Sequence, residues 1–185
     1  FERHHNGVPA IDSDRHRLLI HGLVERPLTL SMHDLTQFPS VTRTLFIECS
    51  GNSGKEWTGL HGNTVQDTHG LMSASEWTGV LLATVLSEAG IKPDAAWVLA
   101  EGSDAAAMTR SLPLAEVLKD ALLCYGQNGE MLRPEQGYPL RLVIPGWEGN
   151  TCIKWLRRLK LGMVPFMTRE ETSRYTDLMP DGTAR

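Results

Sequence analysis

The chain has 185 residues, a length typical of one domain. Hydrophobic residues make up 41% of it and charged residues 22%, which is ordinary for a globular protein. The formal net charge of -4 argues against a nucleic-acid-binding protein, because such proteins normally carry a basic excess. No apolar run approaches the roughly 18 residues that a membrane-spanning helix needs, so we expect no membrane span.

The two ends of the chain read as cut ends of a longer protein. The chain opens with Phe1, without a methionine or an apolar signal core, and it closes in a polar tail at Arg185. We therefore interpret residues 1–185 as one domain of a longer mature protein. The three cysteines cannot all pair with one another, and none lies in a CxxC motif, so we expect no disulfide framework.

The first third of the chain predicts strands around one short helix. Residues 17–24 form an apolar run that predicts a strand, and a short second strand follows. Ser31–Asp34 has the form of a capping box, so a short helix should begin there and end before Pro39. Residues 41–48 alternate between polar and apolar and predict a strand, which leads into the small-residue loop 49–54.

The rest of the chain continues this mixture. Residues 59–70 are polar and glycine-rich and predict a loop, and residues 80–89 predict a helix that ends before a glycine. A short strand over 97–100 and a helix over 113–120 follow. Further strands are predicted over 121–125, 140–144 and 155–161, and the pattern fades beyond Gly162. Strands and short helices without regular βαβ alternation favour the α+β class.

Cys49 is the sharpest candidate for chemistry. It follows the strand 41–48 and opens the loop 49–54, whose small residues would let a bulky ligand approach the sulfur. As a thiolate it would be a nucleophile or a ligand for a soft metal, and the alternative is a small hydrophobic side chain of the core. Cys124 lies in an apolar run and is predicted to be core. Cys152 could face a ligand, although the core is favoured.

Two groups of basic residues could bind an anion. Arg3, His4 and His5 form a compact cluster, for which a solvated and frayed terminus is the alternative. Arg141 and Lys154 flank a glycine-rich turn and could cradle a phosphate, with the arginine giving a two-pronged grip. Solvated strand ends are the alternative for that pair.

Several segments, taken in chain order, carry a family pattern. They are residues 1–9 (FERHHNGVP), 48–52 (ECSGN), 75–80 (SEWTGV) with Leu86, 101–104 (EGSD), 136–141 (QGYPLR) and 145–156. Together they resemble the molybdopterin domain of the sulfite oxidase family over nearly the whole chain. Within that family, residues 1–5, 49–53 and 168–175 most resemble the molybdenum subunits of sulfane dehydrogenases, from the Sox thiosulfate-oxidising system.

This resemblance implies a fold and a site. The fold is an α+β, sulfite-oxidase-type molybdopterin-binding domain with a mixed sheet and short flanking helices. Cys49 is implied as the metal ligand, and Arg3 and Tyr175 as the catalytic residues that orient a sulfur oxyanion. The residues implied to hold the molybdenum–molybdopterin cofactor are Phe1, Glu2, Arg3, His4, Cys49, Asp104, Gln136, Arg141, Cys152, Ile153 and Lys154.

The resemblance also implies an activity and partners. It implies a periplasmic molybdenum-dependent dehydrogenase that oxidises sulfane sulfur on a cysteine of a sulfur-carrier protein and passes electrons to a c-type cytochrome subunit. The chain has no CxxCH motif, so the haem would belong to that partner. Full-length family members also carry a C-terminal immunoglobulin-like dimerisation domain, which these residues do not include. For the intact protein we expect a homodimer or a heterotetramer.

Two departures from true sulfite oxidases bear on the substrate. An arginine that those enzymes carry after the cysteine motif falls on Gly54 here, and a histidine that precedes the phosphate-binding arginine is replaced by Gln136. The lost arginine argues against free sulfite, because a dianion would favour that charge. The alternatives are a sulfite dehydrogenase, a metal-free partner-binding domain of the same fold, and a methionine-sulfoxide reductase of the same superfamily.

Overall fold

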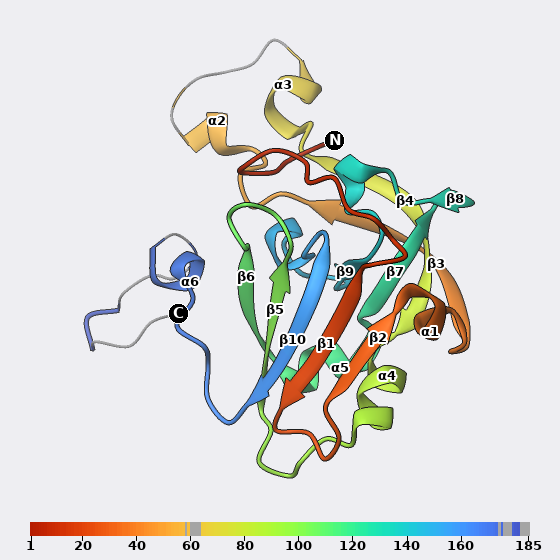
Figure 1. Ribbon diagram of the computed structural model, residues 1–185. Coiled ribbons are helices and arrows are strands. Elements are labelled where there is room, and N and C mark those ends of the chain that lie inside the picture. The colour runs from red at the N-terminus through yellow and green to blue at the C-terminus, as the bar shows by residue number, and fades with distance from the viewer. Residues whose placement is uncertain (58, 60–63, 174, 176–178, 182–185) are drawn as a thin grey trace.

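Two five-stranded sheets pack face to face and enclose the core (Figure 1). The computed structural model describes residues 1–57, 59, 64–173, 175 and 179–181. The main core cluster takes Ile20 and Leu159 from one sheet and Leu123 and Leu142 from the other, all with an exposed fraction of 0%. No described helix is long and apolar enough to cross a membrane.

The first sheet is mixed. Its order is β2-β1-β10-β5-β6, in which β1 and β10 run parallel and every other pair is antiparallel. Alternation along β1 buries Leu18 and Ile20 toward the other sheet, as a strand with one solvated face requires. The strands are β1 Arg17–Gly22, β2 Leu28–Ser31, β5 Trp97–Gly102, β6 Thr109–Pro113 and β10 Leu156–Gly162.

The second sheet is antiparallel throughout. Its order is β3-β4-β7-β8, and β9 also pairs with β7. Gly79 lies where β4 crosses β7, and a Cβ there would stand 2.2 Å from the carbonyl oxygen of Leu123, so the close approach requires glycine. The strands are β3 Ser40–Glu48, β4 Met72–Leu81, β7 Leu122–Gln127, β8 Glu130–Met131 and β9 Arg141–Val143.

Short helices lie at both ends of the two sheets. In Figure 1, α4 and α5 lie at the lower end, where their apolar faces join the main core, and α2 and α3 lie at the upper end near the N-terminus. The helices are α1 Met32–Thr36, α2 Gly54–Trp57, α3 Val65–His69, α4 Leu82–Ala89, α5 Leu114–Asp120 and α6 Arg169–Ser173, with 3-10 turns η1 Pro134–Gln136 and η2 Gly149–Thr151.

The expected α+β class with a mixed sheet and short helices is confirmed, and most of the elements that we predicted are present. The predicted capping box of Ser31 and Asp34 is formed and starts α1. The helix expected over 80–89 begins only at Leu82, because Val80 and Leu81 finish β4 opposite Leu123 and Leu122.

The prediction of a loop over 59–70 is partly wrong, because residues 65–69 form the helix α3. A capping box between Thr64 and Asp67 starts that helix, the same signal that was used for α1. Residues 60–63 of the expected loop lie outside the described residues. The strands β4, β6 and β8 and the helices α2 and α6 were not predicted.

Candidate active site

A cavity of about 230 Å³ lies at the end of the molecule that carries the N-terminus. Its lining comes from the N-terminal segment, from β3, β4 and β9 of the second sheet, from the loops that follow β3 and β5, from the loops on either side of β9, and from the segment after α6. All but one of the sequence-predicted site residues line this cavity: Phe1, Arg3, His4, Cys49, Asp104, Gln136, Arg141, Cys152, Ile153, Lys154 and Tyr175. The fold therefore brings together residues that lie far apart in the sequence.

Glu2 is the exception. It lines a neighbouring hollow with Arg133 and Glu130, and Gln136 borders both spaces. Its carboxylate nevertheless affects the cavity. Burial lowers the pKa of Lys154, and the negative charge of Glu2 partly offsets that lowering.

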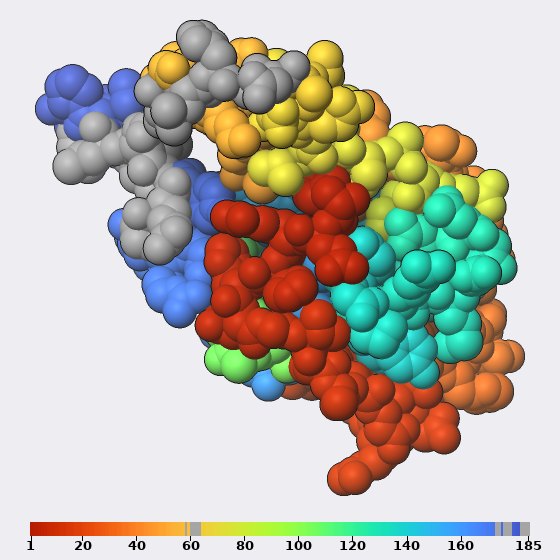
Figure 2. Space-filling model, turned by 90° about the horizontal axis from the view of Figure 1, so that it is seen from above, coloured from red at the N-terminus to blue at the C-terminus, as the bar shows by residue number. Residues whose placement is uncertain are grey.

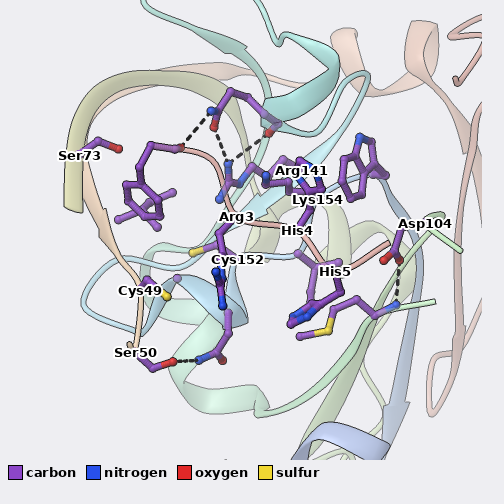
Figure 3. A pocket seen from close by; sticks show the side chains of 18 of the residues that line it. Arg3, His4, His5, Cys49, Ser50, Ser73, Asp104, Arg141, Cys152 and Lys154 are labelled. Atoms are coloured by element: carbon purple, nitrogen blue, oxygen red, sulfur yellow. Dashed lines mark hydrogen bonds between the residues drawn. The ribbon is translucent and has the colours of Figure 1, made fainter. Parts of the chain in front are cut away.

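Cys49 lies on the wall formed by the end of β3 (Figure 3). It is half-buried, its backbone N–H donates to Leu71, and its carbonyl accepts from the N–H of Asn52, so hydrogen bonds hold the loop on both sides of the sulfur. A Cβ on Gly51 would stand 3.8 Å from Sγ of Cys49, which shows how closely the backbone approaches the thiol. The thiol is accessible from the cavity, as a metal ligand must be.

The neighbouring turn η2 packs directly on the end of β3. A Cβ on Gly149 would lie 2.9 Å from the carbonyl oxygen of Glu48, so this contact requires glycine. The contact brings Asn150 beside the cysteine loop, where its amide donates to Oγ of Ser50 at 3.3 Å (Figure 3).

Arg141 forms a cationic wall of the cavity. Its side chain is buried, with an exposed fraction of 4% for the residue, and Nη1 donates to both the backbone oxygen and Oε1 of Gln136 at 3.2 Å. Its guanidinium also lies 5.1 Å from the ring centroid of Trp77. In the described part of the chain Arg141 makes no ion pair with a carboxylate, and its Nε has no hydrogen-bond partner. Such a buried, uncompensated cation is costly unless an anion binds it.

Lys154 adds a second cation beside Arg141. Its Nζ donates to the carbonyl oxygen of Glu135 at 2.6 Å, and burial together with the charge of Arg141 lowers its pKa to about 8. Gly137 separates the two side chains: a Cβ there would stand 3.1 Å from Cβ of Lys154 and 3.2 Å from Cβ of Arg141. Its φ of +109° also lies in the region that favours glycine.

The N-terminal segment lies across the cavity. In Figure 2 its red atoms lie between the yellow residues that follow the cysteine loop and the cyan residues around η1. Nε2 of Gln136 donates to the carbonyl oxygen of Phe1 at 3.3 Å, and the ring of His4 lies edge-on to Trp155 at 6.3 Å. These contacts place Arg3 and His4 over the cavity (Figure 3).

Asp104 and Cys152 line the same space from more deeply buried positions. Oδ1 of Asp104 accepts from the backbone N–H of Met108 at 2.9 Å. Sγ of Cys152 accepts from the N–H of Ile144 at 3.4 Å, and burial raises its pKa. Cys124 is fully buried and its pKa is also raised by burial, so the prediction of a core residue is confirmed.

Sequence reasoning did not select some residues of this site. Ser73 and Trp77 line the cavity from β4, and Asn150 lines it from η2. Arg110, on β6, lies behind the lining with its guanidinium 4.5 Å from the ring centroid of Tyr175. Trp77 stood inside a recognised family segment, which could have marked it, whereas Arg110 lies in a strand that was not predicted.

The lining of the cavity suits a cofactor that carries a phosphate group and a soft metal. The buried guanidinium of Arg141, with its unpartnered Nε, and the amine of Lys154 suit a phosphate. The half-buried thiol of Cys49 at the other side of the cavity suits a soft metal. The residues present therefore fit such a group.

Comparison with known proteins gives the family that the sequence segments resemble. A family model described as an oxidoreductase molybdopterin binding domain matches residues 5–169, so the chain belongs to this family and its cofactor is the molybdenum–molybdopterin group. The relationship to sulfite oxidases that we predicted is confirmed.

The chain resembles several particular proteins. It is 36% identical to the NADH nitrate reductase of Ulva prolifera over 86% of this chain and 20% of that protein. It is 35% identical to human mitochondrial sulfite oxidase over 87% of this chain and 32% of that protein. The chain thus spans a fifth to a third of these relatives. The crystal structure of the sulfane dehydrogenase SoxCD from Paracoccus pantotrophus superposes with a TM-score of 0.93 at 49% identity, covering 100% of this chain and 47% of that chain.

Proposed function

We propose that this domain is the molybdenum domain of a sulfane dehydrogenase. It would oxidise a sulfane sulfur held on a cysteine of a carrier protein, pass the electrons to a c-type cytochrome and work in the periplasm. The observation that carries the proposal is the similarity to SoxCD, at 49% identity over the whole chain, against 34% to 36% for sulfite oxidases and most of the nitrate reductases. The intact protein would be a homodimer or a heterotetramer with its cytochrome.

The cavity divides into a cofactor side and a substrate side. Cys49 would hold the molybdenum, and Arg141 and Lys154 would bind the phosphate, with Gln136 and Asp104 among the polar groups around the pterin. When bound, the cofactor supplies the two-electron redox chemistry at its metal. The protein positions the cofactor and the substrate.

The substrate side would be formed by residues at the mouth. Arg3 would bind the oxyanion that develops on the sulfur, and the phenol of Tyr175 would donate a hydrogen bond to it. Gln136 holds the backbone at Phe1, so it also fixes the segment that carries Arg3. The N-terminal segment lines this space with Phe1, Arg3 and His4.

The decisive experiment uses the full-length protein, loaded with molybdenum cofactor and mixed with its cytochrome. Reduction of the cytochrome is measured with carrier protein bearing a cysteine persulfide and, separately, with sulfite. We expect a kcat/KM for the carrier-bound sulfane at least tenfold above that for sulfite. Faster turnover of sulfite than of the carrier would refute the proposal.

Oxidation of free sulfite is the second candidate function. The identity of 35% to human sulfite oxidase favours it, as do the cationic side chains that line the cavity. Gly54, at the start of α2, occupies the position of the arginine that sulfite oxidases carry there, and this absence of charge disfavours a free dianion. The same cytochrome assay separates the two candidates.

A further inference from the structure

Arg110 is a buried arginine held by contacts on three sides. It lies on β6 with an exposed fraction of 7%, and its Nε donates to Oε1 of Glu171 on α6 at 2.7 Å. Its Nη1 donates to Oδ1 of Asn150, and its guanidinium lies 4.5 Å from the ring centroid of Tyr175. One guanidinium thus joins a carboxylate, an amide and an aromatic ring.

Two of these partners line the candidate active site. Tyr175 and Asn150 both face the cavity, and the amide of Asn150 also donates to Ser50, the residue after Cys49. Arg110 therefore stands directly behind the substrate side of the cavity, one side chain away from it.

Glu171 anchors this arrangement to the first sheet. Its Oε1 accepts from the backbone N–H of Ser111 at 2.9 Å as well as from Arg110, so α6 is fastened to the edge of β6. The ion pair is largely buried, with exposed fractions of 9% and 15% for the two side chains. A buried carboxylate at this distance neutralises the guanidinium charge.

The geometry requires an arginine. Its planar group can bond the carboxylate and the amide at its edge while its face stacks on the phenol ring, and a lysine amine cannot do both. The result is a firmly placed wall for the substrate side, in which the carboxylate of Glu171 offsets the charge of Arg110.

We propose that the Arg110–Glu171 pair is a specificity-determining element of this site. The arginine positions Tyr175 and Asn150, and the glutamate cancels its charge, so that the cavity accepts a sulfur group on a polypeptide in preference to a free dianion. This inference rests on the proposed function, since it explains how one cavity would prefer carrier-bound sulfane.

The test uses the full-length, cofactor-loaded protein in three forms besides wild type: Arg110→Met, Glu171→Gln and the control Arg26→Met. Arg26 also pairs with a glutamate, Glu88, but both side chains are more than half exposed and neither lines the cavity. Two quantities are measured, namely KM and kcat with carrier-bound sulfane, and the dissociation constant of inorganic sulfate by calorimetry.

We expect Arg110→Met to raise KM for the carrier about tenfold and to lower kcat as well, because the placement of the substrate and of the Tyr175 phenol is lost. Glu171→Gln keeps the shape of the side chain but removes the negative charge that offsets Arg110. Sulfate should therefore bind at least about threefold more tightly. Arg26→Met should change neither quantity. A gain in sulfate affinity cannot arise from a variant that merely folds poorly.

The proposal is overturned if Arg110→Met lowers only the melting temperature and leaves KM unchanged, or if Glu171→Gln leaves sulfate binding unchanged. The two hypotheses fail separately. If wild type does not oxidise carrier-bound sulfane, the proposed function is wrong, whereas tighter sulfate binding in Glu171→Gln would still show that the pair controls the charge of the cavity.

Discussion

Cys49 and Cys124 carry the same side chain in opposite environments. Cys49 follows β3 at the wall of the cavity and is half-buried, whereas Cys124 lies inside the second sheet with an exposed fraction of 0%. Burial raises the pKa of the Cys124 thiol, which keeps it protonated and inert. Of these two cysteines, Cys49 has the access that a metal ligand needs.

The first prediction follows from this contrast. Cys49→Ser should reduce molybdenum from near one per chain to a small fraction, because a hydroxyl is a poor ligand where a soft thiolate is required. Metal content of the full-length protein by plasma mass spectrometry is the measurement. Cys124→Ala is the matched control, expected to cost about 1 kcal/mol of stability and to keep the metal. Equal molybdenum in Cys49→Ser and wild type would contradict the assignment.

Lys154 gives a pH-dependent prediction for the cofactor-free protein. Burial, and then Arg141, lower its pKa from 10.5 to about 8. Between these values the unfolded chain binds a proton that the folded chain has released, so the free energy of unfolding due to Lys154 rises with pH. Below pH 8 both states are protonated and this contribution is constant.

As pH rises from 8 toward 10.5, the melting temperature of cofactor-free Lys154→Met should therefore rise less than that of the wild type. Lys119→Met, at an exposed position on α5, should follow wild type. A bound phosphate would favour the charged amine again, so loading the cofactor should flatten the wild-type profile. Parallel profiles for Lys154→Met and wild type would rule out this account.

At the scale of single elements, Gly137 shows how a turn shapes the cationic wall. It caps η1 in the left-handed region, and its missing side chain leaves room for Lys154 and Arg141 to approach each other. Gly137→Ala should cost about 1–3 kcal/mol of stability through backbone strain and crowding. It should also weaken cofactor retention, because both cations are displaced.

Gly129 is the matched control for that variant. It also has a positive φ, +78°, but a Cβ there meets nothing within 4 Å. Gly129→Ala should show the backbone cost of about 1–2 kcal/mol alone, with molybdenum content unchanged. Chemical unfolding and metal analysis of the two variants separate strain from damage to the site. Equal metal content in both variants would show that Gly137 has no role in the wall.

The elements that could be predicted from sequence were those that serve the core. The alternating burial of β1 and the capping box of α1 are local signals, and both were recognised. The long strand β4 was not, because Ser73 faces the cavity and is not an apolar core residue. In β6, Arg110 takes its partner from α6, far along the chain, so its polar sequence gave no strand pattern.

At the scale of the whole molecule, the candidate site exists only when both sheets are assembled. Cys49 follows a strand of the second sheet, Asp104 follows a strand of the first, and Phe1 reaches across to Gln136. The family segments predicted which residues gather here, because the resemblance supplied long-range information that local patterns lack. Tyr175 and Asn150 both contact Arg110, through tertiary contacts that no local signal contains.

The last prediction concerns how a whole carrier protein reaches the cavity. A Cβ on Gly54 meets nothing within 4 Å, and its φ is not positive, so a side chain can begin there without backbone strain. The residue lies at the start of α2, directly after the cysteine loop, where a long cation would both attract an anion and obstruct a polypeptide.

Gly54→Arg in the full-length enzyme should therefore lower KM for sulfite by about threefold or more and reduce kcat/KM for carrier-bound sulfane about tenfold. Gly54→Gln separates the two effects, because it adds a side chain without charge and should impair the carrier without improving sulfite. If Gly54→Arg improves sulfite oxidation and leaves turnover of the carrier unchanged, open space at this position has no part in selecting a protein-bound substrate. Both variants could lose activity on the carrier while only Gly54→Arg gains activity on sulfite. That result would show that the size and the charge of the side chain at position 54 act separately.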